Sequence, residues 1–225
     1  AANTTGTDNV AVGANALDAN TTASNNTAVG DNALGANTTG AGNTAVGYSA
    51  LDAATTNSYN TALGYSALGG ALTADYNTAV GGNALLVCTS GYYNNAFGYA
   101  ALDACTTGHS NVGIGSLALG AHTTGNFNTA VGVSALTANT TSADNVAVGY
   151  QALLTQTTGT RSVGIGAYAL KVSNANDNTA VGCTALDANT TGGLNTAVGS
   201  GALSANTTAA GNTAVGYQAL AANST

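Results

Sequence analysis

Small, apolar and polar residues recur along the whole chain at a fixed spacing. A segment that reads Asn-Thr-Ala-Val-Gly, or a close variant of it, begins at thirteen places, and the interval between successive starts is seventeen in every case but one, where it is sixteen. The consensus unit is Asn-Thr-Ala-Val-Gly-Tyr-x-Ala-Leu-x-Ala-Asn-Thr-Thr-Gly-x-x, with its residues numbered as positions 1 to 17. The starts are Asn9, Asn26, Asn43, Asn60, Asn77, Asn94, Asn111, Asn128, Asn145, Ser162, Asn178, Asn195 and Asn212. A constant period of this kind indicates a repeat architecture.

Positions 1 to 5 of each unit alternate as a β-strand requires. Positions 2 and 4 are mostly apolar or β-branched, as at Val10 and Val12, while positions 1, 3 and 5 are small or polar. We therefore expect one strand per unit, with positions 2 and 4 directed into the core. The invariant Leu at position 9 is expected on a second short strand that forms the opposite wall. The segment Asn-Thr-Thr-Gly is expected to turn the chain back to the next unit.

A unit of this length with two or more turn signals is too short for a pair of helices, but it fits one coil of a parallel β-solenoid. The sequence predicts an all-β fold, a β-roll of about 13 rungs of 17 residues, with residues 1–225 as a single repeat domain. Neighbouring rungs of such a stack lie about 4.8 Å apart. Neither end shows a polar capping segment, so we expect a segment of a longer fibre or a subunit that stacks end to end.

Charge is almost absent from this repeat. Only 5% of the residues are charged, with two basic and nine acidic residues and a formal net charge of −7, and there is no proline. Two cations cannot neutralise a row of phosphates, so nucleic acids and anionic membrane surfaces are excluded as partners. The hydrophobic content of 44% argues against disorder. No apolar run reaches the eighteen residues needed to span a membrane, so no membrane insertion is expected.

The expected outer face of the strands is uncharged as well. If positions 2 and 4 face inward, the outward row consists of Asn, Ala or Gly, and Gly. Exposed strands usually carry charged side chains that prevent association, and a flat row of small residues favours packing against another surface. The sequence therefore predicts a homo-oligomer, either a trimer or a filament.

Several units resemble the head repeats of trimeric autotransporter adhesins. The segments concerned are Asn-Val-Ala-Val-Gly at 9–13 and 145–149, Asn-Val-Gly-Ile-Gly at 111–115, and Ser-Val-Gly-Ile-Gly at 162–166. The segment Asn-Thr-Ala-Val-Gly-Tyr-Gln-Ala-Leu at 212–220 is also similar to repeats of phage tail fibres and bacterial surface proteins. The resemblance implies a left-handed parallel β-roll, a trimer, and attachment to matrix or host surfaces. The unit differs from the adhesin pattern in its longer Asn-Thr-Thr-Gly return.

Tyrosines cluster in the first half of the chain. Tyr59, Tyr76 and Tyr93 share position 17 on successive rungs, and Tyr92 adjoins the last of them. Exposed aromatic columns can stack on sugar rings or fill an interface. These four residues are candidate contacts for a surface glycan or a host receptor, and the alternative is plain stacking between rungs.

Two cysteines share position 12 on adjacent rungs. Cys88 and Cys105 are expected about 4.8 Å apart, within the Cα separation that a disulfide accepts, so they form a candidate disulfide. The alternative is a ladder of small inward or turn residues. His122 holds the same position on the next rung. Three ligands in a straight column do not converge tetrahedrally on one ion, so no metal site is expected.

The single short unit, 162–177, has both basic residues of the chain in it or next to it. Arg161, Lys171 and Asp177 are candidates for a contact between neighbouring chains, and the alternative is a local bulge. Asp177 is expected to pair with Arg161 or Lys171.

Eight Asn-x-Ser/Thr sequons occur, and seven of them have their Asn at position 12 of the repeat. A ladder of side-chain amides along the turn is favoured over glycosylation for these residues. The seven are Asn3, Asn20, Asn37, Asn139, Asn189, Asn206 and Asn223.

No arrangement of residues points to catalysis or to a cofactor. Paired carboxylates, a Ser or Cys activated by His, and a phosphate-binding loop are all absent from the sequence, so the chain is not expected to be an enzyme. We predict an extracellular structural or adhesive fibre segment of a surface protein, secreted filament or virion that acts through multivalency. One alternative is an end-to-end filament subunit. The other is an ice-binding solenoid, suggested by Thr at positions 13 and 14, although adjacent positions point to opposite faces.

Overall fold

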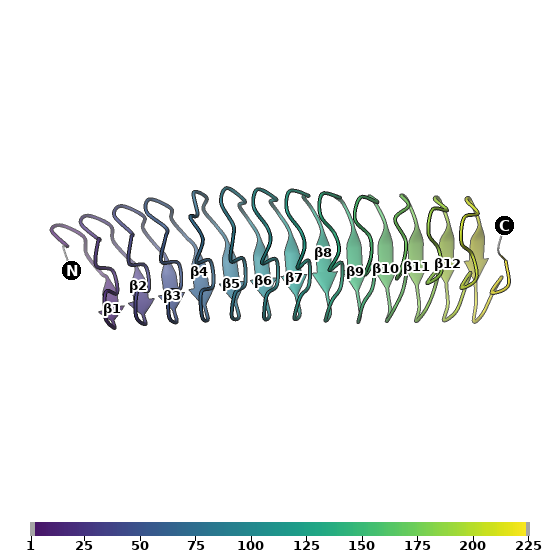
Figure 1. Ribbon diagram of the computed structural model, residues 1–225, viewed down its shortest axis with the longest axis horizontal. Coiled ribbons are helices and arrows are strands. Elements are labelled where there is room, and N and C mark those ends of the chain that lie inside the picture. Colours follow the sequence, from purple (N-terminus) through teal and green to yellow (C-terminus); the bar gives the residue numbers. More distant parts are fainter. Residues whose placement is uncertain (1–2, 224–225) are drawn as a thin grey trace. The chain divides into compact units, whose positions relative to one another are not determined.

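The computed structural model describes residues 3–223, which form thirteen short β-strands and no helix (Figure 1). The chain divides into two compact units, residues 1–111 and residues 112–225, and each is described by itself. Every repeat contributes one strand, at positions 2 to 4. The predicted fold class, an all-β parallel solenoid with one rung per repeat, is confirmed. The outermost residues of the predicted uncapped ends, 1–2 and 224–225, lie outside the described residues.

The first unit contains six strands that pair in chain order, parallel and in register (Figure 1). Each strand residue pairs with the residue at the same position of the next repeat, as Thr44 does with Thr61. Equivalent positions of successive repeats therefore form straight columns. The strands are β1 (Val10–Val12), β2 (Thr27–Val29), β3 (Thr44–Val46), β4 (Thr61–Leu63), β5 (Thr78–Val80) and β6 (Asn95–Phe97).

The second unit contains seven strands with the same parallel pairing. The short repeat keeps this register, because Val163 still pairs with Thr179, the residue at position 2 of the next repeat. In this repeat the return segment is therefore one residue shorter, and the strand keeps its length. The strands are β7 (Val112–Ile114), β8 (Thr129–Val131), β9 (Val146–Val148), β10 (Val163–Ile165), β11 (Thr179–Val181), β12 (Thr196–Val198) and β13 (Thr213–Val215).

Position 3 of the strand, and not positions 2 and 4, faces the core. Ala28, Ala45 and Ala62 are completely buried, whereas the flanking residues of the same strands are half-buried or exposed. The prediction that positions 2 and 4 point inward is wrong. The large β-branched residues lie on the outside of the sheet, and the outward row of Asn, Ala and Gly that we expected does not exist.

The narrow interior of the coil explains this inversion. A Cβ atom built on Gly164, at position 3, would lie 3.2 Å from Cγ of Leu153 and 3.2 Å from the carbonyl oxygen of Ala169. The Leu at position 9 therefore fills the space opposite the strand and leaves room for a methyl group at most. Larger β-branched side chains fit the pleated outer surface instead.

The invariant Leu at position 9 lies in a turn and not in a second strand, so that expectation is also wrong. Leu51 has a left-handed φ of 54° and is fully buried, and its N–H donates to the carbonyl oxygen of Ala67 at 3.0 Å. The left-handed turn directs each Leu back toward the strand, while the backbone hydrogen bond joins adjacent rungs.

The invariant Gly at position 5 ends each strand with a backbone conformation that other residues rarely adopt. Gly47 has a φ of +137°, and a Cβ atom on it would lie 2.4 Å from the carbonyl oxygen of Gly64. Glycine is required here for both reasons, because the backbones of successive rungs approach each other too closely for a side chain.

Two columns of buried Asn side chains hold the rungs together from inside. At position 1, the Oδ1 atom of Asn26 accepts from the N–H of Asn43 at 2.9 Å, and its Nδ2 donates to the carbonyl oxygen of Gly40 at 2.9 Å. At position 12, Nδ2 of Asn37 donates to the same Gly40 oxygen at 2.9 Å and to Oδ1 of Asn20 at 3.3 Å. These amides satisfy backbone groups that the narrow core would otherwise leave unpaired.

The amide-ladder interpretation of the sequons is confirmed for those Asn side chains of position 12 that are buried. They cannot carry a glycan in the folded protein, because the amide is enclosed and hydrogen-bonded. These residues are Asn20, Asn37, Asn139, Asn189 and Asn206.

Candidate functional site

The outward residues of the strands form two parallel rows, one at position 2 and one at position 4. We call this surface the Thr/Val face. No charged residue occurs at either position in any of the thirteen strands. In β2 to β5 the rows consist of Thr27, Thr44, Thr61 and Thr78 at position 2, and of Val29, Val46, Leu63 and Val80 at position 4. In β11 to β13 they consist of Thr179, Thr196 and Thr213, and of Val181, Val198 and Val215.

The Thr/Val face leaves large apolar side chains in contact with solvent. Leu63 and Phe97 are 45% and 40% exposed although each stacks on a neighbouring strand. Residues in one row repeat about every 4.8 Å, and the two rows lie about 6.6 Å apart, since successive outward residues are two steps along a strand. An uncharged apolar ladder of this length is the kind of surface that marks an interaction site.

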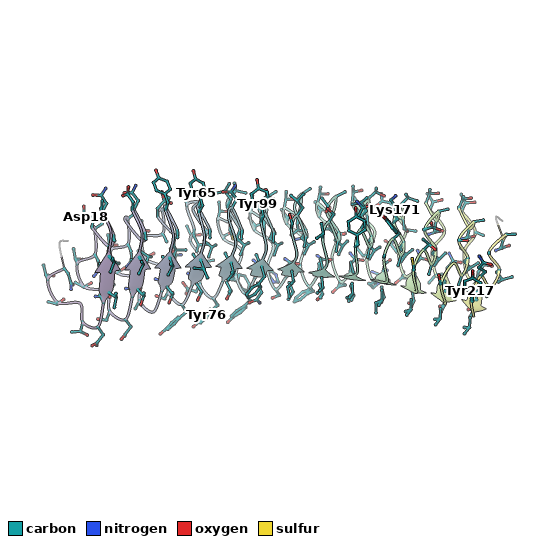
Figure 2. All side chains as sticks on the ribbon, turned by 90° about the horizontal axis from the view of Figure 1, so that it is seen from below. Asp18, Tyr65, Tyr76, Tyr99, Lys171 and Tyr217 are labelled. Atoms are coloured by element: carbon teal, nitrogen blue, oxygen red, sulfur yellow. The ribbon has the colours of Figure 1, made fainter. Side chains whose placement is uncertain are left out.

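The predicted tyrosine column forms on the first unit. The ring of Tyr76 stacks on that of Tyr59 with centroids 5.3 Å apart and planes at 6°, and on that of Tyr93 with centroids 5.2 Å apart and planes at 25°. Tyr76 projects from the side opposite Tyr65 and Tyr99 (Figure 2). The rings stack between rungs, and the glycan or receptor contact stays a prediction.

The ring of Tyr92 stands at an angle to this column, so the two form a corner. Its ring meets that of Tyr93 edge to face, with centroids 5.4 Å apart and an angle of 75° between the planes. The ring of His109 stacks on Tyr92 at 4.6 Å and 10°. An open hollow of about 380 Å³ lies at this corner. We call it the tyrosine hollow, and its lining residues are Thr73, Ala74, Asp75, Tyr76, Ser90, Tyr92 and Tyr93.

The hollow lies beside an irregular return segment in the repeat that starts at Asn60. In regular repeats, the Thr at position 13 donates its N–H and its hydroxyl to the carbonyl of the next position 13, as Thr38 does to Thr55. Here Thr73, which is fourteenth in its repeat, makes both of these bonds to Thr89.

Ala74, the next residue, occupies the structural place of position 15. The carbonyl oxygen of Ala74 accepts from Nδ2 of Asn60 at 3.1 Å, as the position 15 carbonyl does in other repeats. No residue therefore occupies position 14 on this rung. Leu72 fills the buried place of the usual Asn, and Ala71, which the sequence alignment of the repeats put there, is exposed. The repeat keeps its full length because an extra residue precedes Leu72.

Asp75 supplies the charged group of the hollow. Its Oδ1 atom accepts from the N–H of Ser58 at 2.8 Å, which fixes the carboxylate at the rim. Within the described part of the chain, no donor is bonded to its other oxygen. The hydroxyl-bearing residues Thr73 and Ser90 are exposed beside it.

Cys88 and Cys105 are free thiols, both buried. Each Sγ–H donates to the carbonyl oxygen three residues later, at 3.4 Å for Cys88 to Gly91 and at 3.5 Å for Cys105 to Gly108. The neighbouring Cys88 side chain, together with burial, raises the pKa of the Cys105 thiol well above its usual range. The two thiols lie on adjacent rungs as expected, and the candidate disulfide between them stays a prediction.

His122 holds position 12 of its repeat, in the second unit, and is completely buried. Its Nδ1 lies 2.8 Å from Oδ1 of Asn139, and its Nε2 lies 2.7 Å from the carbonyl oxygen of Gly125. Burial lowers the pKa of this imidazole, against the opposing effect of the two hydrogen bonds. Among the residues described, no group of three or more His, Cys, Asp and Glu side chains could hold a metal ion.

The basic residues near the short repeat do not form one cluster. Arg161 donates from Nε and an Nη to the two oxygens of Asp177, at 2.7 and 2.9 Å, and this pairing lowers the pKa of the Asp177 carboxyl. The Nζ atom of Lys171 instead lies over the ring of Tyr168, 5.1 Å from its centroid. The expected pairing of Asp177 is therefore with Arg161. A contact of these three residues with a neighbouring chain stays a prediction.

Comparisons with protein-family models, with curated proteins and with solved structures found no match to this chain. Within residues 3–223 there is no helix that could cross a membrane. The two surfaces that the geometry singles out are therefore the Thr/Val face and the tyrosine hollow. Three tyrosines of the hollow, Tyr76, Tyr92 and Tyr93, were candidates from the sequence, but Asp75 and the hollow itself were not predicted. The Leu in place of Thr at residue 72 was a visible signal of the altered return.

Proposed function

We propose that this chain is a non-enzymatic structural and adhesive segment of an extracellular fibre, and that copies of it pack laterally through the Thr/Val face. The observation that carries the proposal is the uncharged outward rows of the described strands, in which most residues are Thr, Val or Ile and large apolar side chains such as Leu63 and Phe97 are exposed. Attachment to a host receptor or surface glycan belongs to the same proposal. A stiff repeat suits this role, since many weak contacts then add up.

A second copy of the chain is the partner that best matches this face. The side chains to be covered repeat once per rung, with no charge to specify a different partner. Another solenoid with the same rise per rung can place its own rows between them over many rungs. Closed symmetry would give a trimer, while a contact that does not close would give a filament.

Lysine substitutions within the face test the proposal. In the double variant Val46→Lys and Val80→Lys, two charges would have to be buried between copies, so the assembly should dissociate. The measurement is the molar mass by light scattering after size exclusion, with negative-stain electron microscopy to separate trimers, filaments and monomers. The matched control is Tyr65→Lys, on an exposed residue outside the two rows, which should keep the mass of the unmodified chain. Unchanged assembly in the double variant would reject lateral packing through this face.

Ice binding is the second candidate, and the Thr/Val face is the surface that we propose for it. Positions 13 and 14 do not present two free rows, because the position 13 hydroxyl is bonded to the next rung, as in Thr38 to Thr55 at 3.0 Å. The Thr/Val face instead offers a regular row of hydroxyls beside a row of methyl groups. An ice-recrystallisation assay separates the two functions, since a face that is covered by other copies would leave ice growth unchanged.

A further inference from the structure

We propose that the tyrosine hollow binds an alkylammonium ion, with a quaternary trimethylammonium group as the best fit. The inference rests on the adhesive part of the proposed function, but it needs only one copy of the chain. Every residue that it uses lies within the first unit.

Two aromatic walls of the hollow stand nearly at a right angle. The ring of Tyr92 meets that of Tyr93 at 75°. Tyr76 is stacked between Tyr59 and Tyr93, so it presents a ring edge to the hollow. His109 covers one face of Tyr92 at 4.6 Å, so the opposite face is the one available to a ligand. Aromatic faces attract cations through the ring quadrupole, and a corner of rings is the arrangement that surrounds a methylated ammonium group.

A carboxylate completes the site. Asp75 lines the hollow together with the rings, and its Oδ1 accepts from the N–H of Ser58 at 2.8 Å, so the second oxygen is not used by this bond. The carboxylate and the free face of Tyr92 then act on the same positive charge. A neutral sugar would use the rings but would gain nothing from the charge of Asp75.

The charge of the whole first unit favours a cation as well. Residues 1–111 contain six of the nine acidic residues and neither of the two basic residues. No lysine or arginine of this unit can therefore neutralise Asp75. The resulting negative potential raises the local concentration of cationic ligands at low ionic strength.

The hollow exists because the return of this rung is one residue short. A residue at position 14 would project beside Tyr76, where Ser90 projects on the next rung, and would narrow the opening. The volume of about 380 Å³ lies within the range of about 300–1,000 Å³ that is usual for small-ligand sites. The altered return and the aromatic corner occur together on this pair of rungs.

Calorimetric titration of the full chain with a matched pair of ligands tests the proposal. The pair is choline and 3,3-dimethylbutan-1-ol, which has the same shape without the charge. We expect choline and tetramethylammonium to bind with weakening at high salt, and the neutral alcohol to bind at least about tenfold more weakly. Equal binding of the charged and neutral ligands, no binding of the cations, or tighter binding of neutral monosaccharides would overturn the proposal.

Two substitutions test whether choline binds in the hollow. Asp75→Asn keeps an oxygen that can accept from Ser58, and Tyr92→Ala removes one wall, so each should weaken choline binding by about 5- to 30-fold. Tyr92→Phe keeps the aromatic face and should bind within about twofold of the unmodified chain. Tyr65→Ala, on the opposite side of the unit, is the control and should leave binding unchanged. Equal loss in Tyr65→Ala and Tyr92→Ala would contradict a site in the hollow.

The failure of this inference can be told apart from failure of lateral packing. The double variant Val46→Lys and Val80→Lys should still bind choline whatever its molar mass, because neither residue lines the hollow. Cosedimentation with phosphatidylcholine vesicles then distinguishes a headgroup from a free cation as the source of the ammonium group. Binding of choline with or without vesicle binding supports the site, and loss of choline binding in the double variant would overturn it.

Discussion

The smallest side chains of each rung decide which way the strand faces. Alanine or glycine at position 3 is the only residue that fits opposite the Leu of position 9, so the larger neighbours are turned outward. A hydrophobicity pattern alone cannot show this, because Val and Ala both count as apolar. The relevant signal in the sequence was the restriction of position 3 to Ala or Gly in all thirteen repeats, against variable size at position 4.

A matched pair of substitutions in β3 tests this orientation. Ala45→Val adds two methyl groups to a fully buried site and should destabilise the fold by about 1–3 kcal/mol. Val46→Thr changes an outward side chain of similar shape and should alter stability by no more than about 0.5 kcal/mol. Chemical denaturation of both variants measures the difference, and a larger loss for Val46→Thr would mean that position 4 faces the core.

We expect His122 to make the stability of the folded chain depend on pH. Because burial lowers the pKa of its imidazole below the unfolded value of about 6.5, the unfolded chain binds more protons than the folded chain just below that pH. Stability should therefore fall as the pH drops through about 6.5, and should stop falling below the folded pKa.

Replacing His122 by Asn, the residue usual at position 12, isolates this effect. The thermal midpoint of the unmodified chain should fall more between about pH 7.5 and pH 5.5 than that of His122→Asn. Burial also raises the pKa of Asp103 and Asp187, which acts in the opposite direction, but both proteins share those groups. Equal shifts of the two midpoints would show that His122 is not responsible.

At the scale of the rung, the strand and the register followed from the sequence, because a fixed repeat period leaves one way to stack equivalent positions. The turn at position 9 did not, since the left-handed φ of Leu51 has no signature in its own residue type. The tyrosine hollow did not follow from the sequence either. Its origin is a shift in which Leu72 replaces an Asn of the buried ladder, and only the hydrogen bonds of Thr73 and Ala74 reveal it.

The buried Asn of position 1 links neighbouring rungs through its side-chain amide. In Asn43→Ala, the N–H of Asn60 and the carbonyl of Asn57 would lose their side-chain partners inside the core, and the cost should be about 2–4 kcal/mol. Asn32→Ser, at a half-buried turn position where Ser49 and Ser66 occur naturally, is the control and should cost far less. Denaturation midpoints compare the two, and similar losses would argue against the internal amide ladder.

At the scale of the whole molecule, the low charge content can be assigned to particular surfaces. The uncharged residues are not a passive surface, because they include the Thr and Val rows along the outside of the strands of each unit. The described charged residues lie instead outside the strands, as Asp75 does beside the tyrosines of the hollow. The proposed face for other copies of the chain and the proposed site for a cationic ligand thus lie on different elements.

The mass of the unmodified chain in solution tests the central claim, lateral packing of copies through the Thr/Val face, most directly. Sedimentation velocity should be recorded over a wide range of protein concentrations. We predict a species or a distribution at multiples of the chain mass of 21.4 kDa, including a trimer if the packing closes. A single species of 21.4 kDa at every concentration would contradict the claim.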